Sequence, residues 1–178
     1  PFANPETSVV LGVSPYNTHD TFLSKLISYD ALNVAVTYLS MARVGHPYMG
    51  VGRNLAYRKE LFFKNSGFKS HLHLASGDDD LFIKEVANKK NTAIVLEPES
   101  QTFSEPKTTW DGWIRQKKRH FTTAPYYRPG TKFILGLWPF SFLALWISCL
   151  LWMVLHSEFL IAGSMLLLRY IVHLATFR

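Results

Sequence analysis

Residues 133–155 are 23 consecutive positions within the longest run of the chain without a charged residue. As a helix it would span about 34 Å at roughly 1.5 Å per residue, enough to cross a hydrocarbon core of about 30 Å. Trp138, Trp146 and Trp152 add aromatic side chains of the kind found at membrane interfaces. The run therefore predicts a transmembrane helix over residues 133–155.

A second apolar segment, residues 159–177, predicts a return span that is truncated where the sequence stops. Arg169 lies inside it, and because a charge in the hydrocarbon core is costly, a tilted or partly interfacial segment is the alternative. Basic residues precede the first span, so the positive-inside rule predicts a multi-pass protein of the cell (inner) membrane with a cytoplasmic soluble part. The basic residues are Arg115, Lys117, Lys118, Arg119, Arg128 and Lys132.

Residues 1–131 form the predicted soluble domain, and residues 132–178 form the predicted transmembrane hairpin. Apolar, β-branched runs at residues 7–13 and 92–96 predict strands, and Leu55 begins a third. Apolar spacing also predicts a helix that ends before Gly45-His46-Pro47. Alternating strands and helices indicate an α/β fold. The expected buried face of the helix consists of Phe22, Leu26, Tyr29, Val36 and Leu39.

Three consecutive carboxylates, Asp78, Asp79 and Asp80, follow Gly77 and precede the apolar residues of a short predicted helix. The positive end of the helix dipole favours acidic groups there by roughly 0.3–1 kcal/mol per charge. Adjacent like charges raise at least one pKa, so such a cluster either binds a divalent cation or supplies a proton-accepting carboxylate. The alternative is an N-capping Asp with two solvated neighbours.

A second constellation lies just before the predicted membrane span. If residues 109–121 are helical, Trp113, Gln116, Arg119 and His120 share one face. Arg offers a planar fork for diphosphate oxygens, Gln bonds to hydroxyls, and Trp offers a stacking surface, so this face suits a phosphorylated, hydroxyl-rich ligand. The alternative is a basic helix attracted to anionic lipid, and the two roles are compatible.

Two weaker patterns add candidate sites. Gly52, Arg53 and Asn54 combine close backbone approach with polar donors before a strand, which predicts the floor of a pocket, although ordinary turn chemistry gives the same pattern. His71 and His73 would point to one face of a strand. A zinc pair is one interpretation of them, and exposed or hydrogen-bonded histidines are the favoured one because no cysteine accompanies them.

Together these motifs resemble the C-terminal half of a membrane-bound family 2 glycosyltransferase of the GT-A fold. In that family an acidic motif and a strand precede a Gln-x-x-Arg-Trp motif, and membrane helices follow. Here the second motif is Gln116-Lys117-Lys118-Arg119-His120, so His120 replaces the Trp, and three acids replace the usual pair. The resemblance implies a partial GT-A-like mixed sheet with flanking helices, followed by two C-terminal transmembrane helices. It also implies that the family's first half is missing, so the fragment alone should be inactive.

The same resemblance implies the reaction. A hexosyltransferase-type enzyme would move a sugar with inversion from a nucleotide-sugar donor to a hydroxyl acceptor, for cell-envelope glycan or glycolipid synthesis. Asp79 or Asp80, with Asp78 as the further candidate, would be the general base. Gln116, Arg119, His120, Trp113, Gly52, Arg53 and Asn54 would bind donor or acceptor. Mg²⁺ or Mn²⁺ is implied as cofactor, with its main ligand motif in the missing half, and membrane lipid is an expected partner.

Two other functions compete with this one. A non-catalytic, membrane-bound remnant would keep the fold and bind partners. A metal-dependent membrane phosphotransferase or hydrolase would use Asp78 and Asp80 as metal ligands. Nucleic-acid binding is not favoured, because the basic excess within the net charge of +6 lies mainly beside the predicted span, where lipid explains it.

Overall fold

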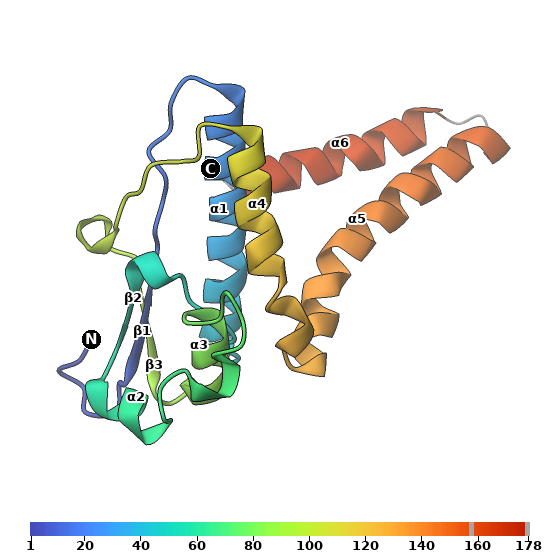
Figure 1. The fold of residues 1–178 in the computed structure, drawn as a ribbon. Coiled ribbons are helices and arrows are strands. Elements are labelled where there is room, and N and C mark those ends of the chain that lie inside the picture. The colour runs from blue at the N-terminus through green and yellow to red at the C-terminus, as the bar shows by residue number, and fades with distance from the viewer. Residues whose placement is uncertain (157–158, 177–178) are drawn as a thin grey trace. The chain divides into compact units, whose positions relative to one another are not determined.

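The structure is a computed structural model that describes residues 1–156 and 159–176. The chain divides into two compact units, residues 1–127 and residues 128–178. Figure 1 shows a small sheet with helices in the first unit and helices alone in the second. The described part of the chain is therefore mixed α/β, as the sequence predicts.

The central strand of the sheet is β1 (Val9–Gly12). It pairs antiparallel with β2 (Leu55–Tyr57) and parallel with β3 (Thr92–Val95), giving the order β2-β1-β3 within the described residues. All four residues of β1 are buried, which explains why the strand is a continuous apolar run instead of an alternating one. The parallel partner β3 lies far along the sequence because parallel strands need a long crossover.

Two helices of the first unit run side by side, α1 (Phe22–Arg43) and α4 (Trp110–Phe121). Each begins at a threonine whose side chain accepts a hydrogen bond from a backbone N–H group three residues on, which satisfies one free donor of the first turn. The Phe22 and Trp110 rings lie 6.3 Å apart, and Lys117 of α4 forms an ion pair with Asp30 of α1.

The predicted buried face of α1 is wrong by about one position. Phe22 and Tyr29 are exposed, whereas Leu23, Ile27 and Tyr38 are buried. Apolar residues occur around most of this helix, so their spacing alone does not select the face that packs on the sheet.

The short helix α3 (Asp80–Val86) is held by an aromatic cluster. Phe82 is fully buried, and its ring centroid lies 4.7 Å from Tyr57 of β2. It lies 5.7 Å from Phe62 of α2 (Lys59–Lys64) and 5.6 Å from Phe68. A helix of seven residues is not stable alone, so this packing determines where α3 begins.

The strand considered for His71 and His73 does not form. A 3₁₀ turn covers Lys69–His71, and turns and bends follow it. His71 is buried, whereas His73 is exposed with its ring 6.1 Å from that of Tyr126. The His71 N–H group donates to the Phe68 carbonyl oxygen and the His71 carbonyl oxygen accepts from Leu74, so local turn bonds use the groups that a strand would pair. The two imidazoles therefore do not share a strand face.

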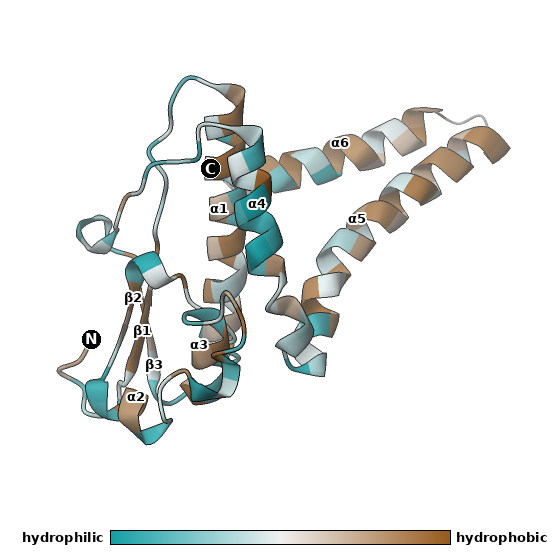
Figure 2. Ribbon diagram, viewed as in Figure 1, coloured by the Kyte–Doolittle hydropathy of each residue, from teal (hydrophilic) through white to brown (hydrophobic). Residues whose placement is uncertain are grey.

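The second unit consists of α5 (Pro129–His156) and α6 (Phe159–Thr176), and both are largely hydrophobic in Figure 2. Among the described residues, α5 is the helix long and apolar enough to cross a membrane, judged by length and composition. A second span is not confirmed, because α6 is shorter and contains Arg169. Residue 177 of that predicted span lies outside the described residues.

Aromatic side chains of α5 surround the charged group of α6. The Arg169 guanidinium carbon lies 4.9 Å from the Phe142 ring centroid and 5.8 Å from that of Trp138. The ring of His173 lies 6.2 Å from Trp138. Aromatic faces attract cations, so these rings lower the cost of a charge in an apolar hairpin.

Replacing Phe82 by alanine tests the role of the aromatic cluster. We expect Phe82→Ala to lower the free energy of unfolding by about 3–5 kcal/mol, because it leaves a cavity in the core under α3. Phe63→Ala is the matched control, since Phe63 is 65% exposed and its truncation should change stability little. Denaturant unfolding monitored by circular dichroism measures both, and equal losses for the two variants would contradict the anchoring role of Phe82.

Candidate active site

Asp79 connects the start of α3 to the turn before β2. Its carboxylate Oδ1 accepts a hydrogen bond from the Asp80 N–H group at 2.8 Å, and its Oδ2 accepts one from the Gly52 N–H group at 3.0 Å. Burial raises the pKa of Asp79, the Gly52 hydrogen bond opposes that rise, and the charges of Asp80 and Asp78 add to it. Two segments 27 residues apart thus meet at one carboxylate.

Asp80 is the buried member of the triplet, with 5% of its surface exposed. Its Oδ1 accepts a hydrogen bond from the Leu81 N–H group, and its Oδ2 accepts one from the Tyr127 hydroxyl at 2.7 Å. Burial and the negative charge of Asp80 raise the pKa of Tyr127, so this hydroxyl stays protonated and keeps donating. The Tyr48 ring contacts Tyr127 edge-on at 5.4 Å. Asp80 therefore anchors the end of the first unit.

Asp78 is the exposed member of the triplet, and it follows a turn that requires glycine. Gly77 has φ +117°, and a Cβ added there would lie 2.9 Å from Cδ1 of Leu81. The backbone therefore turns sharply just before the carboxylates. Asp78 is accessible to solvent, while Asp79 and Asp80 are engaged in the structure of the turn.

The predicted pocket floor is a 3₁₀ turn, Gly52–Asn54, and its side chains face different partners. The Asn54 amide donates to the carbonyl oxygens of Val13 and Ser100, at 2.6 and 2.9 Å, so it holds two loops together. Arg53 donates through Nη2 to the Ser14 carbonyl oxygen, and its guanidinium lies 4.1 Å above the Tyr16 ring.

Arg53 also has an unused donor. Within the described residues, its buried Nη1 atom has no hydrogen-bond partner. Burying such a donor without an acceptor is unfavourable, so this atom calls for an explanation. The nearby hydroxyl of Tyr38 donates to the Gly12 carbonyl oxygen at 2.6 Å. Burial raises the pKa of Tyr38 to about 12, although the Arg53 charge opposes the rise.

The predicted face of α4 reaches this region at two points. Gln116 Nε2 donates to the Tyr16 hydroxyl at 3.4 Å, so Gln116 and Arg53 contact opposite parts of one side chain. Burial and the neighbouring Arg119 lower the pKa of His120, while the charges of Asp79 and Asp80 act in the opposite direction. His120, although exposed at its surface, therefore lies within electrostatic range of the acidic turn.

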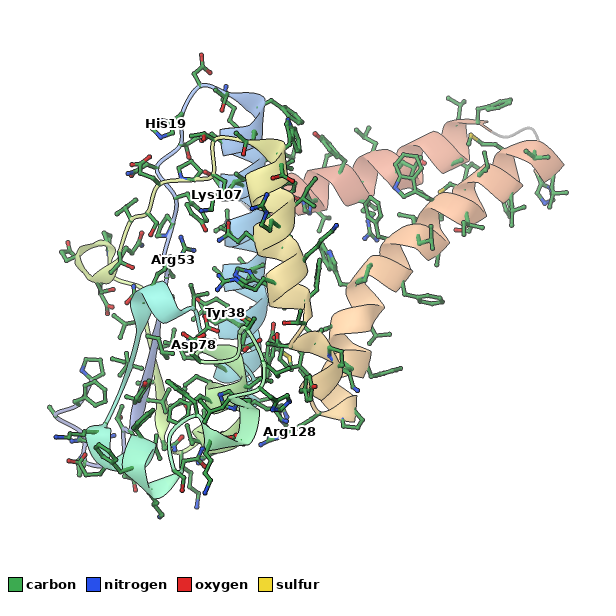
Figure 3. All side chains as sticks on the ribbon, in the orientation of Figure 1. His19, Tyr38, Arg53, Asp78, Lys107 and Arg128 are labelled. Carbon is green, nitrogen blue, oxygen red and sulfur yellow. The ribbon has the colours of Figure 1, made fainter. Side chains whose placement is uncertain are left out.

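The structure thus brings together most but not all of the predicted site residues. In Figure 3, Tyr38, Arg53 and Asp78 extend from α1, from the turn before β2 and from the loop before α3. Trp113 instead contacts Trp110 at 5.8 Å, and Asn54 is occupied by backbone groups. Arg119 is exposed on α4. Sequence reasoning missed Tyr16, Tyr48 and Tyr127, because tyrosines without regular spacing give no signal of a shared site.

The Mg²⁺ or Mn²⁺ that the resemblance implies has no ligand set in the described part of the chain. No group of three His, Cys, Asp or Glu side chains there is placed to bind a metal ion. The oxygens of Asp79 and Asp80 already accept hydrogen bonds from protein donors. We therefore assign no step of the reaction to a metal.

Removing the Tyr127 hydroxyl tests the anchor of the acidic turn. We expect Tyr127→Phe to destabilise the protein by about 1.5–3 kcal/mol, because a buried carboxyl group loses its donor. Tyr126→Phe is the control, since Tyr126 is the exposed neighbour. Thermal melting followed by circular dichroism compares the two, and a Tyr127→Phe protein as stable as the control would contradict the anchoring contact.

Comparison with known proteins places the chain in a family. No curated protein matches the chain. The family described as Glycosyl transferase family group 2 matches residues 2–177, which is nearly the entire sequence. The match includes the acidic turn, the Gly52–Asn54 turn and α4. The chain belongs to glycosyl transferase family group 2 and carries a family 2 glycosyltransferase domain.

Proposed function

We propose that the chain contributes the acceptor side of an inverting hexosyltransferase that acts in cell-envelope glycan or glycolipid synthesis. Family membership supports glycosyl transfer from a nucleotide-sugar donor to an acceptor. The observations that carry the rest are the hydrogen bond from Gly52 to the acidic turn and the electrostatic effect of that turn on His120, while Arg53 and Gln116 meet at the Tyr16 side chain. Carboxylates and cations on one site suit a reaction that removes a proton at one end and releases a diphosphate at the other.

Asp78 is the general base in this proposal. A base must reach the acceptor hydroxyl, and Asp78 is the exposed carboxylate. The sequence favoured Asp79 or Asp80. However, both oxygens of each of these residues already accept hydrogen bonds that fix the turn. We assign Asp79 and Asp80 to positioning, because losing either would release the segment that carries Asp78.

The reaction is a single displacement. The acceptor hydroxyl oxygen forms a bond to the anomeric carbon as its proton passes to the Asp78 carboxylate. The bond from that carbon to the diphosphate oxygen breaks on the opposite face, and its electron pair leaves with the nucleoside diphosphate. The exposed Arg119 guanidinium is the donor available to the leaving diphosphate, which gathers charge in the transition state. Gln116 and His120 lie beside this region and suit sugar hydroxyl groups.

The alternatives are not favoured. A phosphotransferase that binds metal through Asp78 and Asp80 would need the oxygens of Asp80, which Leu81 and Tyr127 already occupy. A non-catalytic remnant is not favoured, because the family match includes the acidic turn, the Gly52–Asn54 turn and α4.

Membrane attachment is part of the proposal. It rests on the length and apolar composition of α5 and on the basic residues that precede it. We expect the full-length protein to remain in the membrane fraction after washing with alkaline carbonate, which removes peripheral proteins. Release into the supernatant would contradict a spanning helix, and the same test on a protein truncated after Tyr127 reports whether the second unit is responsible.

Changing each aspartate to asparagine tests the assignment of the base. Full-length protein would be incubated with a panel of UDP- and GDP-hexoses and membrane extract as acceptor, and the release of nucleoside diphosphate measured. We expect Asp78→Asn to lower kcat by about 10²–10⁴, because the side chain keeps its shape and cannot accept the proton. Asp20→Asn is the control, since Asp20 is exposed and pairs with Lys25 away from the site.

The three positions should also differ in stability. Asp78→Asn should melt like the unchanged protein, whereas Asp80→Asn should melt earlier because it disturbs the Tyr127 contact. A fully active Asp78→Asn protein would rule out Asp78 as the base.

A further inference from the structure

His71 is a buried imidazole that the proposed reaction does not use. The residue is 5% exposed, and within the described residues its Nε2 atom has no hydrogen-bond partner. Nearly all buried polar atoms in proteins are satisfied, so an unpartnered nitrogen in the interior calls for an explanation. His71 lies in the turn that leads to the acidic triplet.

The hydrogen bonds around Nδ1 determine which nitrogen carries the proton. The Ser70 hydroxyl donates to Glu85 Oε1 at 2.7 Å and lies 2.9 Å from His71 Nδ1. Burial alone would raise the pKa of Glu85, but hydrogen bonds from Ser70 and Asn65 lower it, so Glu85 is ionised and can only accept. Since Ser70 gives its one hydrogen to Glu85, it must accept from His71, and Nδ1 carries a proton.

The opposite edge of the ring lies against the acidic turn. A Cβ added to Gly77 would lie 3.2 Å from His71 Cδ2, the carbon bonded to Nε2. Phe68, a member of the aromatic cluster around Phe82, lies 5.8 Å from the imidazole. The ring thus fills the space between the aromatic cluster and the backbone that precedes Asp78. Glu85 belongs to α3, and Gly77 lies just before α3. The contacts of Glu85 with Ser70, of Ser70 with His71 and of His71 with the Gly77 turn therefore start on this helix and return to the residues that precede it.

We propose that His71 is a positioning residue for Asp78. The Glu85–Ser70–His71 chain fixes the imidazole as the Nδ1–H tautomer, and the ring then supports the Gly77 turn that aims the Asp78 carboxylate at the acceptor hydroxyl. This inference rests on the proposed function for its effect on rate, but the tautomer and the ring contact do not depend on it. A base displaced by about 1 Å can lose roughly a hundredfold in rate, so a support of this kind controls kcat.

Nuclear magnetic resonance of the full-length protein labelled with ¹⁵N-histidine tests the placement without any assay of activity. We expect the signals of the neutral His71 ring to place its proton on Nδ1, and Ser70→Ala to abolish this preference. A His71 ring protonated at Nε2 alone would overturn the proposal.

Kinetics test the consequence. Ser70→Ala and His71→Phe should each lower kcat about tenfold or more while the KM for the nucleotide-sugar stays within about twofold, since neither residue binds the donor. The double variant should be no worse than the poorer single one, because both act through one chain of contacts. His73→Phe is the matched control, an exposed histidine two residues away.

The outcomes separate this inference from the proposed function. Unchanged kcat in both variants, or rate losses that add in the double variant, would overturn the role of His71. If the loss of kcat in each variant only parallels its loss of melting temperature, His71 has a purely structural role, and the proposed positioning role is overturned. If Asp78→Asn proves fully active, the proposed base is wrong, while the tautomer measurement still decides whether the Glu85–Ser70–His71 chain exists.

Discussion

The burial of Phe82 is the contact on which the candidate site depends. A seven-residue helix gains too few hydrogen bonds to overcome the cost of its nucleation, so α3 exists because its apolar residues are enclosed by the core. Phe82 does this by packing against rings from β2, from α2 and from the loop that follows α2. Once that ring is in place, the helix start and its three carboxylates have little freedom to move.

The carboxylates themselves then connect segments that are distant in the sequence. Asp79 accepts from the turn before β2, and Asp80 accepts from Tyr127 at the end of the first unit. Crowding three acids would be unfavourable in isolation, but hydrogen bonds from backbone N–H groups and a tyrosine satisfy two of them. The arrangement leaves the first aspartate facing solvent. Two acids of the triplet therefore have structural roles that support a third.

Local sequence signals predicted most helices and strands, whereas long-range packing determined which faces are buried and which side chains meet at the candidate site. The β-branched runs gave the strands, and the acidic triplet before an apolar run correctly gave the start of α3. The buried face of α1 was misjudged because that helix is apolar on several sides. The strand considered at His71 did not form because the backbone there makes a 3₁₀ turn with local hydrogen bonds. The contacts of Tyr16 and Tyr127 could not be predicted, since their partners lie about 100 and 47 residues away in the sequence and local patterns carry no information on such contacts.

The second unit carries a comparable constraint in the contact of Arg169 with Phe142 and Trp138. A slip of α6 by one residue along α5 would turn the guanidinium by about 100°, away from both rings and into apolar surroundings. Because that exposure is costly, the arginine favours one register of α6 against α5 and disfavours registers shifted by one residue. A charge that is costly in an apolar segment thus sets the register of the two helices along their length.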